Sequence, residues 1–332
     1  MNTRSLGAKG PRVSSIGLGC MAMSGVYGPA DEAESIATIR AALDAGVTLL
    51  DTGDFYGMGH NEMLIRDALR SVGREHVVIS VKFGALRDPF NGWGGYDCRP
   101  KAVKNFLAYS LKRLGVDYVD IYRPARLDGS VPIEETIGAI AEMVTAGCVR
   151  HVGLSEVGVE TIRRAAAVHP ICDLQIEYSL LSRGIEARIL PACRDLGIGI
   201  TAYGVLSRGL ISGHWSKERS AAGDPRLRFP RFTSSNLEHN LGLVEALRAV
   251  ADGKGVTVAQ LAIAWVAAQG KDIVPLVGAR RSESLSEALG ACDINLTTAD
   301  LALIEAAVPS GAGAGQRYAQ QVMGELDSEK DS

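Results

Sequence analysis

Three residues of types that handle protons stand close together in the first quarter of the chain. Asp51 directly follows the apolar run VTLL, Tyr56 lies in the same connection, and Lys82 ends the next apolar run, VVISVK. A phenol titrates near pH 10, so it can act as an acid at neutral pH when a neighbouring cation favours its ionised form. Lys82 could be that cation, and Asp51 would keep a buried ammonium charged.

This spacing predicts a relay in which Tyr56 gives a proton to a developing alkoxide and Lys82 stabilises the charge. The alternative is a structural ion pair between Asp51 and Lys82, with Tyr56 as a contact at the rim. In a βα barrel, the residues just past the C-terminal ends of strands face the active-site mouth. All three would then point to one mouth.

The elements that must position these residues alternate between short apolar runs and amphipathic stretches. Helical spacing covers 31–45, 99–114 and 133–146, and extra helices are expected over 237–252, 257–269 and 298–308. Eight βα units predict an α/β fold, a (β/α)8 TIM barrel. The expected strands are Ile16–Gly19, Val47–Leu50, Val77–Lys82, Tyr118–Tyr122, Arg150–Leu154, Leu174–Glu177, Ile198–Tyr203 and Ile273–Val277.

A doubly wound sheet is the competing architecture, since GLG at 17–19 could mimic a dinucleotide-binding turn. No third glycine follows in register and no helix starts at once, which favours the barrel. The region Leu206–Asn236 has no clear periodicity and is too long for a simple connection, so it is interpreted as a functional loop. We expect one domain over residues 1–310 and a partly disordered tail over 311–332.

Composition excludes several classes of function. The net charge of -3 and the lack of a basic patch exclude nucleic acid as the expected partner. Six cysteines without CxxC spacing are interpreted as reduced thiols, and no His pair has metal-ligand spacing, so no metal is expected. No segment approaches the roughly 20 apolar residues that span a bilayer, and no signal peptide is recognised, which predicts a cytoplasmic protein without membrane attachment.

The motifs DTGDFYG followed by NE, SVKFG, LQIEYSLLSR, TAYGVLSRGL and VPLVGARRSESLSEALGA together resemble the aldo-keto reductases. The similarity covers nearly the whole chain and is greatest to the bacterial, fungal and plant branch acting on pyridoxal and aromatic aldehydes. The resemblance implies a barrel with an N-terminal β-hairpin and extra C-terminal helices. It also implies hydride transfer between a nicotinamide cofactor, usually NADPH, and a small carbonyl substrate, with Asp51, Tyr56 and Lys82 as the acid relay.

The resemblance assigns a set of cofactor contacts. Ser155 and Gln175 match residues that hydrogen-bond the nicotinamide carboxamide, and Tyr203 matches the aromatic residue that stacks on its ring. Without the resemblance, Ser155 would be interpreted as a helix cap and Gln175 as polar lining. The positions that match the pyrophosphate loop, the 2'-phosphate site and an adenine contact are Leu206, Ser207, Arg208, Gly209, Gly278, Arg280, Arg281 and Glu287.

One position departs from the family. Where the family usually places a histidine that polarises the substrate carbonyl, this chain reads VDIYRPARLD, which puts Ala125 there. Losing one oxyanion donor typically costs about 100- to 1000-fold in rate. Tyr56 with Lys82 could suffice, Arg123 or Arg126 could reach the oxyanion, or Ala125 could leave room for a bulky ring. His60 is a weaker candidate donor, and His151 begins a strand at the wrong end of the barrel.

The loop at 83–97 follows Lys82 and carries Phe90, Trp93 and Tyr96 among glycines, so an aromatic or cyclic substrate is expected. The alternative is a loop that packs its own aromatics as a cap. We therefore predict an NADPH-dependent reductase of aldehydes or ketones, with Ala125, Arg126 and Trp93 in the substrate pocket. The alternatives are a cofactor-binding regulatory protein with little catalysis and a Schiff-base lyase using Lys82. The oligomeric state does not follow from the sequence.

Overall fold

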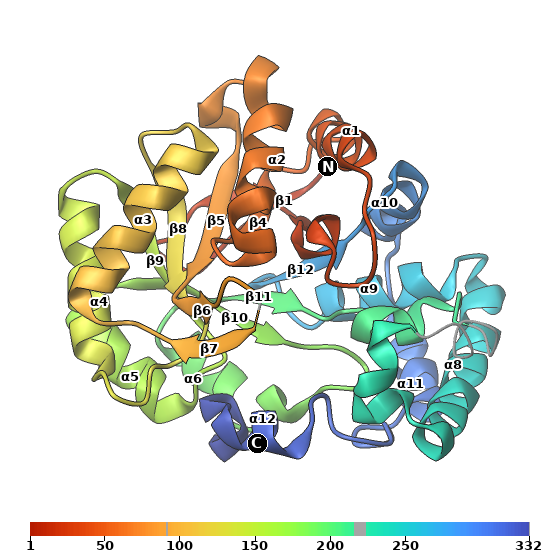
Figure 1. Cartoon of the computed structure of the whole chain (residues 1–332). Helices are drawn as coiled ribbons and strands as arrows, with labels where there is room; N and C mark the ends of the chain where they lie inside the picture. The colour runs from red at the N-terminus through yellow and green to blue at the C-terminus, as the bar shows by residue number, and fades with distance from the viewer. Residues whose placement is uncertain (91, 216–223, 332) are drawn as a thin grey trace.

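The computed structural model describes residues 1–90, 92–215 and 224–331. Eight parallel strands close into a barrel in chain order, and helices surround it (Figure 1). The (β/α)8 prediction is confirmed, and each expected strand is found within a few residues of its predicted bounds. The barrel strands are β3 (Gly17–Gly19), β4 (Leu49–Gly53), β5 (Val78–Phe83), β8 (Val119–Pro124), β9 (Val149–Ser155), β10 (Ile171–Glu177), β11 (Gly199–Tyr203) and β12 (Ile273–Gly278).

The helices pack on the outside of the barrel, and their ends carry ordinary signals. A capping box formed by Thr257 and Gln260 begins α9, and α3 ends at Gly115, whose positive φ suits glycine. None of the helices in the described ranges is both long and apolar enough to cross a bilayer. The helices are α1 (Glu32–Asp44), α2 (His60–Ala68), α3 (Pro100–Leu114), α4 (Ile133–Thr145), α5 (Val159–Val168), α6 (Ile189–Asp195), α8 (Ser234–Lys254), α9 (Val258–Ala268), α10 (Ser282–Leu289), α11 (Thr298–Ala307) and α12 (Gln320–Glu325).

Strand alternation separates two kinds of side chain. In β5, Ile79, Val81 and Phe83 belong to the main hydrophobic core under the helices, whereas Ser80 and Lys82 take the alternate positions inside the barrel. The lower part of the interior is apolar and includes Leu49, Ile121, Val274 and Leu276 together with Leu6 and Val13 of the N-terminal hairpin. The polar side chains of the barrel interior lie between this apolar layer and the C-terminal ends of the strands.

Two hairpins lie outside the barrel sheet. The predicted N-terminal hairpin pairs β1 (Thr3–Ser5) with β2 (Arg12–Ser14). A second hairpin, not predicted as strands, pairs β6 (Ala85–Arg87) with β7 (Trp93–Tyr96) inside the loop expected at 83–97. The functional loop predicted over Leu206–Asn236 contains the 3-10 turns 207–212, 225–228 and 230–232, while 216–223 lie outside the described residues.

The C-terminal tail, expected to be partly disordered, is described up to residue 331 and contacts the barrel. Asn240 of α8 donates a hydrogen bond to the Ala314 carbonyl and accepts one from its N–H. Further along, the buried Arg317 side chain forms an ion pair with Glu156 at the end of β9. The Asp327 carboxylate accepts hydrogen bonds from the N–H of Gly158 and the hydroxyl of Thr161 at the start of α5. Figure 1 shows this last segment running along the lower edge of the molecule.

Candidate active site

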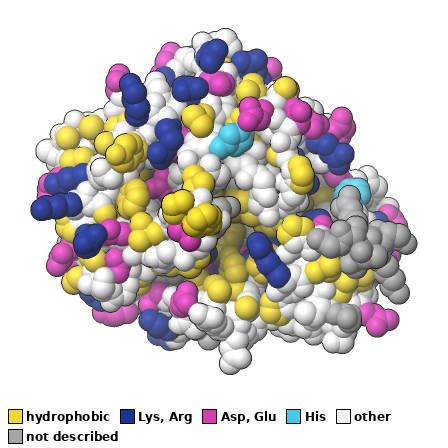
Figure 2. Space-filling model, viewed as in Figure 1, with side chains coloured by type: hydrophobic (Ala, Val, Ile, Leu, Met, Phe, Trp, Pro, Cys, Tyr) yellow, Lys and Arg dark blue, Asp and Glu magenta, His cyan; other side chains and the backbone are white. Residues whose placement is uncertain are grey.

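A cavity of about 1050 Å³ opens where the C-terminal ends of the barrel strands meet. Figure 2 shows this face hollowed near its centre, beside the β6–β7 hairpin, with hydrophobic side chains in and around the hollow. The predicted site residues found in its lining are Asp51, Tyr56, Lys82, Trp93, Ala125, Arg126, Ser155, Gln175, Tyr203, Leu206, Arg208, Gly209, Gly278, Arg280, Arg281 and Glu287.

The carboxylate of Asp51 is the centre of a buried hydrogen-bond cluster. The ammonium of Lys82 donates to its Oδ1, while Gln175 Nε2 donates to Oδ2 at 2.7 Å. The Ser80 hydroxyl also donates to Oδ2 at 2.9 Å. Burial lowers the pKa of Lys82, and the Asp51 carboxylate acts in the opposite direction. The predicted pairing of Asp51 with Lys82 is therefore present, and it fixes the ammonium at the floor of the cavity.

Tyr56 lies beside this pair. The Lys82 Nζ atom is 5.1 Å from the centre of the Tyr56 ring, and the Phe55 ring packs edge-on against the same tyrosine. Burial raises the pKa of Tyr56 well above its ordinary value and Asp51 adds to the rise, while Arg126 lowers it. The sequence predicted that a neighbouring cation would lower the pKa of the phenol. In the structure, burial raises this pKa by more than the nearby cations lower it. The phenol is thus protonated at neutral pH, as a proton donor must be.

Local backbone strain is concentrated at this mouth. The four non-glycine residues with positive φ in the described chain are Met58, Glu156, Ser207 and Arg208. Met58 lies between Gly57 and Gly59 in the turn that follows Tyr56, and the other three follow β9 and β11. Left-handed backbone is costly for side chains other than glycine, and such strain gathers where the surrounding structure enforces a particular geometry.

The residues predicted to hold a nicotinamide end come together on β9, β10 and β11. Gln175 gives its amide N–H to Asp51, which leaves its carbonyl oxygen free to accept from a ligand amide. Among the described residues, the Ser155 hydroxyl has one hydrogen-bond contact, a long one of 3.5 Å with Arg126 Nη1. The ring of Tyr203 lines the cavity, and its hydroxyl donates to Glu156 Oε1 at 2.7 Å. A flat ring next to a carboxamide-sized set of donors and acceptors suits a nicotinamide.

The predicted pyrophosphate loop is only partly directed at the cavity. Leu206, Arg208 and Gly209 line it, whereas the Ser207 hydroxyl bonds to the Ser179 hydroxyl and lies outside the lining. The Arg208 guanidinium lies over the ring of Phe229 at 4.2 Å and over the ring of Tyr318 at 4.6 Å. These rings hold the guanidinium at the cavity wall, where its Nη2 also lies 3.9 Å from Oε2 of the buried Glu177.

At the end of β12, Gly278, Arg280 and Arg281 lead into helix α10. The Arg280 guanidinium donates to the carbonyl of Pro29 at 3.1 Å, whereas Arg281 is exposed at the N-cap position of the helix. A helix N-terminus and an exposed guanidinium together favour an anionic group. The carboxylate of Glu287, expected to contact an adenine, accepts a hydrogen bond from His214 Nε2 at 3.0 Å.

The structure separates the residues considered as replacements for the missing histidine. Ala125 is buried in the cavity lining, and Arg126 faces the cavity with no carboxylate among the described residues within ion-pair distance. Arg123 does not reach the mouth. It is fully buried inside the barrel, where it pairs with Asp173 at 2.9 Å, because β8 extends to Pro124 and alternation turns residue 123 inward. His60 bonds to Ser24 and Glu32 outside the lining.

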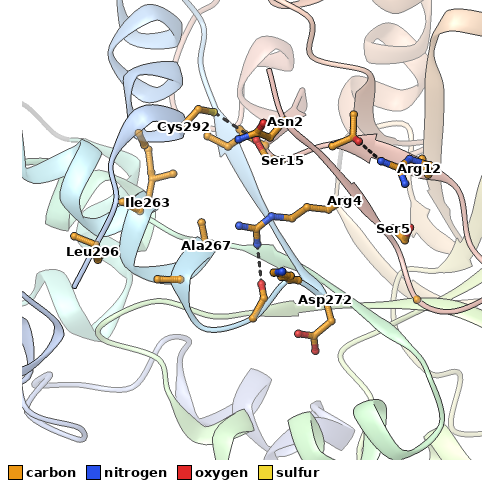
Figure 3. Close-up of a pocket in the computed structure, with 18 of the residues that line it drawn as sticks. Asn2, Arg4, Ser5, Arg12, Ser15, Ile263, Ala267, Asp272, Cys292 and Leu296 are labelled. Carbon is orange, nitrogen blue, oxygen red and sulfur yellow. Dashed lines mark hydrogen bonds between the residues drawn. The ribbon is translucent and has the colours of Figure 1, made fainter. Parts of the chain in front are cut away.

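A second cavity, of about 1140 Å³, lies at the opposite end of the barrel between the N-terminal hairpin and α9 (Figure 3). Arg4 extends across it, and its Nη1 donates to the carbonyls of Gly270 and Ile273. Asp272 forms an ion pair with Arg194 at 2.8 Å, and much of the remaining wall is the Ile263 and Ala267 side of α9. Arg4, Arg194 and Asp272 are thus bound within the protein, whereas Lys271 at the rim is exposed.

Comparison with known proteins decides the family. A family model described as aldo/keto reductase family matches residues 15–309. This chain belongs to the aldo/keto reductase family. It is 42% identical over 314 residues to a protein of Glycine max described as probable aldo-keto reductase 1, covering 94% of this chain and 90% of that protein. Reductases of this family reduce carbonyl groups with a nicotinamide cofactor, so the mouth cavity is the expected place for cofactor and substrate.

Solved structures of other reductases share the fold. A glycerol dehydrogenase from Gluconobacter oxydans superposes with a TM-score of 0.86 at 27% identity, covering 95% of this chain and 97% of that chain. An aldo-keto reductase from Bacillus halodurans, described as the holo form, gives a TM-score of 0.79 at 25% identity, covering 93% of this chain and 97% of that chain. The family model ends at residue 309, so the tail that packs on the reductase barrel lies beyond it.

Several lining or supporting residues of this reductase were missed by the sequence argument. Tyr27 and Tyr318 line the cavity, and the buried Glu156 and Arg317 support it. Glu156 had a usable signal, because it is a polar residue two positions after the predicted strand Arg150–Leu154, where barrel residues face the mouth. Tyr318 and Arg317 stand in a tail of glycine, alanine and polar residues without periodicity. Nothing local in that segment indicates a buried contact.

Proposed function

We propose that this protein reduces the carbonyl group of an aldehyde or ketone with NADPH, and that Tyr56 is the general acid. The observation that carries the proposal is the meeting of Tyr56 with the buried Lys82–Asp51 pair in one cavity that also contains the predicted nicotinamide contacts. That cavity is at the upper end of the range for ligand pockets, about 300–1000 Å³, so a dinucleotide and a small substrate fit together.

The bound cofactor would supply a hydride to the carbonyl carbon, which leaves an electron pair on the carbonyl oxygen. Tyr56 then gives its hydroxyl proton to that oxygen, and water returns a proton to the phenolate. The positive charge of Lys82 stabilises the tyrosinate formed, while Asp51 holds the ammonium in place. Because the pKa of Tyr56 is raised, the phenol keeps its proton until charge develops on the substrate.

Preference for NADPH over NADH rests on the arginines that precede α10. Arg281 is exposed at the helix N-cap and makes no ion pair within the described chain, so its guanidinium is available to a 2'-phosphate. Arg280 holds the neighbouring loop through the carbonyls of Tyr27, Gly28 and Pro29. In this proposal, Arg280 shapes the phosphate site and Arg281 binds the phosphate.

Arg126 is our assignment for the group that hydrogen-bonds the carbonyl oxygen in place of a histidine. The strand ends run in the order β4, β5, β8, β9, and these carry Tyr56, Lys82, Arg126 and Ser155 in turn. Arg126 thus stands between the acid and the predicted carboxamide site. Its Nη1 donates to the Ala125 carbonyl at 2.6 Å and, at 3.5 Å, to the Ser155 hydroxyl, while its Nε and Nη2 make no hydrogen bond within the described residues.

The aromatic wall of the cavity favours an aromatic or cyclic substrate. Trp93 and Tyr96 of the β6–β7 hairpin pack edge-on at 5.0 Å, and Phe55 and Tyr27 line the same cavity. Aromatic rings offer large apolar contact with few polar demands, which suits a flat ring bearing a carbonyl.

The test is NADPH oxidation with a panel of aromatic aldehydes, pyridoxal, quinones and cyclic ketones. Tyr56→Phe should lower kcat/KM by about 100- to 10,000-fold without weakening NADPH binding, because it removes only the acid. Tyr109→Phe, an exposed tyrosine on α3, is the matched control and should behave as wild type. Equal rates for Tyr56→Phe and wild type would refute the assignment of the acid.

Substrate charge separates two roles for Arg126. If Arg126 binds the carbonyl oxygen, Arg126→Gln should slow reduction of benzaldehyde and of 4-carboxybenzaldehyde by similar factors. If it only anchors a substrate carboxylate, the loss should appear for 4-carboxybenzaldehyde alone. Adding Ala125→His to Arg126→Gln should restore rate in the first case and introduce a titration near the ordinary histidine pKa of about 6.5.

A second candidate function is cofactor-dependent regulation of a partner, which Ala125 favours because it removes a carbonyl donor. Tight NADPH binding without turnover on the whole panel would favour this candidate over the reductase. Trapping a carbonyl substrate on Lys82 with borohydride would instead indicate a Schiff base, but the Lys82 amine is engaged by the buried Asp51 carboxylate, which argues against it.

A further inference from the structure

The segment from Ala312 to Ser328 is fixed to the barrel at three places. Residues 312–315 bond to α8 and its preceding turn, where the Gly315 carbonyl accepts from Arg231 and the Ala312 carbonyl from His239. Asp327 caps the start of α5. Between these anchors, Tyr318 lines the cavity and Arg317 bonds to Glu156 behind the lining. The segment therefore closes one side of the mouth.

Glu156 accepts hydrogen bonds from this segment, and its buried carboxylate requires several donors. Its side chain is buried and its backbone has a φ of 54°, directly after Ser155. Arg317 donates to both carboxylate oxygens, at 2.9 Å and 2.6 Å, and the Ser328 hydroxyl donates to Oε2 at 2.7 Å. Together with the Tyr203 hydroxyl and the Glu177 N–H, these donors hold the pKa of Glu156 far below its usual range despite burial.

The same carboxylate oxygen joins the tail to the predicted nicotinamide platform. Glu156 Oε1 accepts from Arg317 Nη1 and from the Tyr203 hydroxyl, and the Tyr318 hydroxyl lies 3.1 Å from that of Tyr203. Replacing a buried ion pair by apolar groups is often neutral or stabilising, so stability alone is a poor reason for such a pair. What the pair supplies is a defined position for the Tyr203 hydroxyl.

We propose that the tail from Ala312 to Ser328 is part of the cofactor site, and that Arg317 is a positioning residue that sets the Tyr203 ring through Glu156. This inference rests on the proposed use of a nicotinamide cofactor. The ring of Tyr203 is then held in the plane that the nicotinamide needs before the cofactor arrives. Cofactor affinity rises because less ordering remains to be done on binding.

Fragments of the cofactor separate positioning from general damage. NADPH reaches Tyr203, whereas 2',5'-ADP carries only the adenosine and 2'-phosphate end and would contact the region of α10. Arg317→Met should weaken NADPH binding by about tenfold or more, because the Tyr203 ring would then have to be ordered when the cofactor binds. Its affinity for 2',5'-ADP should equal that of wild type. Equal losses for both ligands would overturn the proposal.

Two further variants show whether a loss of affinity comes from misfolding. Arg317→Met leaves Glu156 buried without its partner, so Glu156→Gln/Arg317→Met, which removes both charges, provides a folded comparison. It should show the same selective loss of NADPH affinity. Arg183→Met is the matched control, because Arg183, like Arg317, pairs with more than one carboxylate, here Glu186 and Glu305, but lies outside the cavity lining. Its ligand affinities should match those of wild type.

Action through Tyr203 is tested by a double-mutant cycle. Tyr203→Phe should weaken NADPH binding by a factor similar to Arg317→Met, and the double variant should lose little more than either single variant. Additive losses would show that Arg317 does not act through the Tyr203 hydroxyl and would overturn the proposal. All these readouts are binding constants, so they judge the positioning role even if wild type reduces no carbonyl on the panel, which would instead count against the proposed function.

Discussion

The two ends of the barrel carry cavities of similar size, about 1050 Å³ at the mouth and about 1140 Å³ beneath the N-terminal hairpin, but they differ in chemistry. At the mouth, Arg126 and Ser155 keep unused hydrogen-bonding capacity, and Tyr56 meets a buried cation. At the other end, Arg4 is bound by two backbone carbonyls and Asp272 by Arg194. Hydrogen-bonding groups inside the cavity that lack a full set of partners, rather than cavity volume, distinguish the candidate site.

The largest expected effect comes from Lys82→Met. It should lower kcat/KM by about 100- to 10,000-fold. It should also destabilise the fold by about 3–5 kcal/mol, because Asp51 is left buried without its cation. Adding Asp51→Asn should recover much of the stability, measured by urea unfolding, but none of the rate. A double variant with restored rate would show that the pair is only structural.

Arg281→Ala tests the mouth cavity at its phosphate end. NADPH should bind about tenfold more weakly, since a charge-assisted hydrogen bond to the 2'-phosphate is lost. NADH lacks that phosphate, so its dissociation constant should stay within twofold of wild type. Fluorescence titration with both cofactors measures the two constants, and a similar loss for NADH would place the 2'-phosphate elsewhere.

Asp54→Asn tests how the stability of the protein depends on pH near the mouth. Burial and the nearby Glu62 raise the pKa of Asp54 from its ordinary value to about 8. Between about pH 4 and pH 8 the folded state therefore holds a proton that the unfolded state has released, and wild-type stability falls as pH rises through this window. The variant lacks this loss. Its Tm relative to wild type should rise from pH 5 to pH 8.5, whereas a constant difference would contradict the raised pKa.

The smallest effect is expected at the opposite cavity. Arg4→Gln removes a guanidinium from the carbonyls of Gly270 and Ile273, and we expect a loss of about 1 kcal/mol in unfolding free energy. NADPH affinity and kcat/KM should not change. A clear change in either would mean that the two ends of the barrel are coupled and that the lower cavity is more than a structural gap.

Much of the fold could be predicted because its signals are local. Runs rich in valine and isoleucine marked the barrel strands, and the strand-end rule brought Asp51 and Lys82 to one mouth before any contact was known. The position of Arg123 was harder, because one or two residues at a strand end decide which way a side chain points. The β6–β7 hairpin was missed since its glycines and aromatics also suit a loop.

Electrostatic outcomes were less predictable than positions. The sequence predicted Lys82 beside Tyr56, and its Nζ lies 5.1 Å from the ring, but the direction of the Tyr56 pKa depends on how much water the fold excludes, which no spacing reveals. The contact of Glu156 with Arg317 could not be predicted from the sequence either. Its two residues are 161 positions apart, and neither segment carries a periodic pattern that indicates the other.

That separation has a consequence for the order in which the chain is made. Glu156 and Tyr203 leave the ribosome long before Arg317, so a nascent barrel must carry the Glu156 carboxylate without its cation until the tail is translated. The mouth is thus incomplete until residue 317 has been made. A protease cut near residue 316 would act first on the predicted nicotinamide end of the cavity, leaving the eight-stranded framework in place.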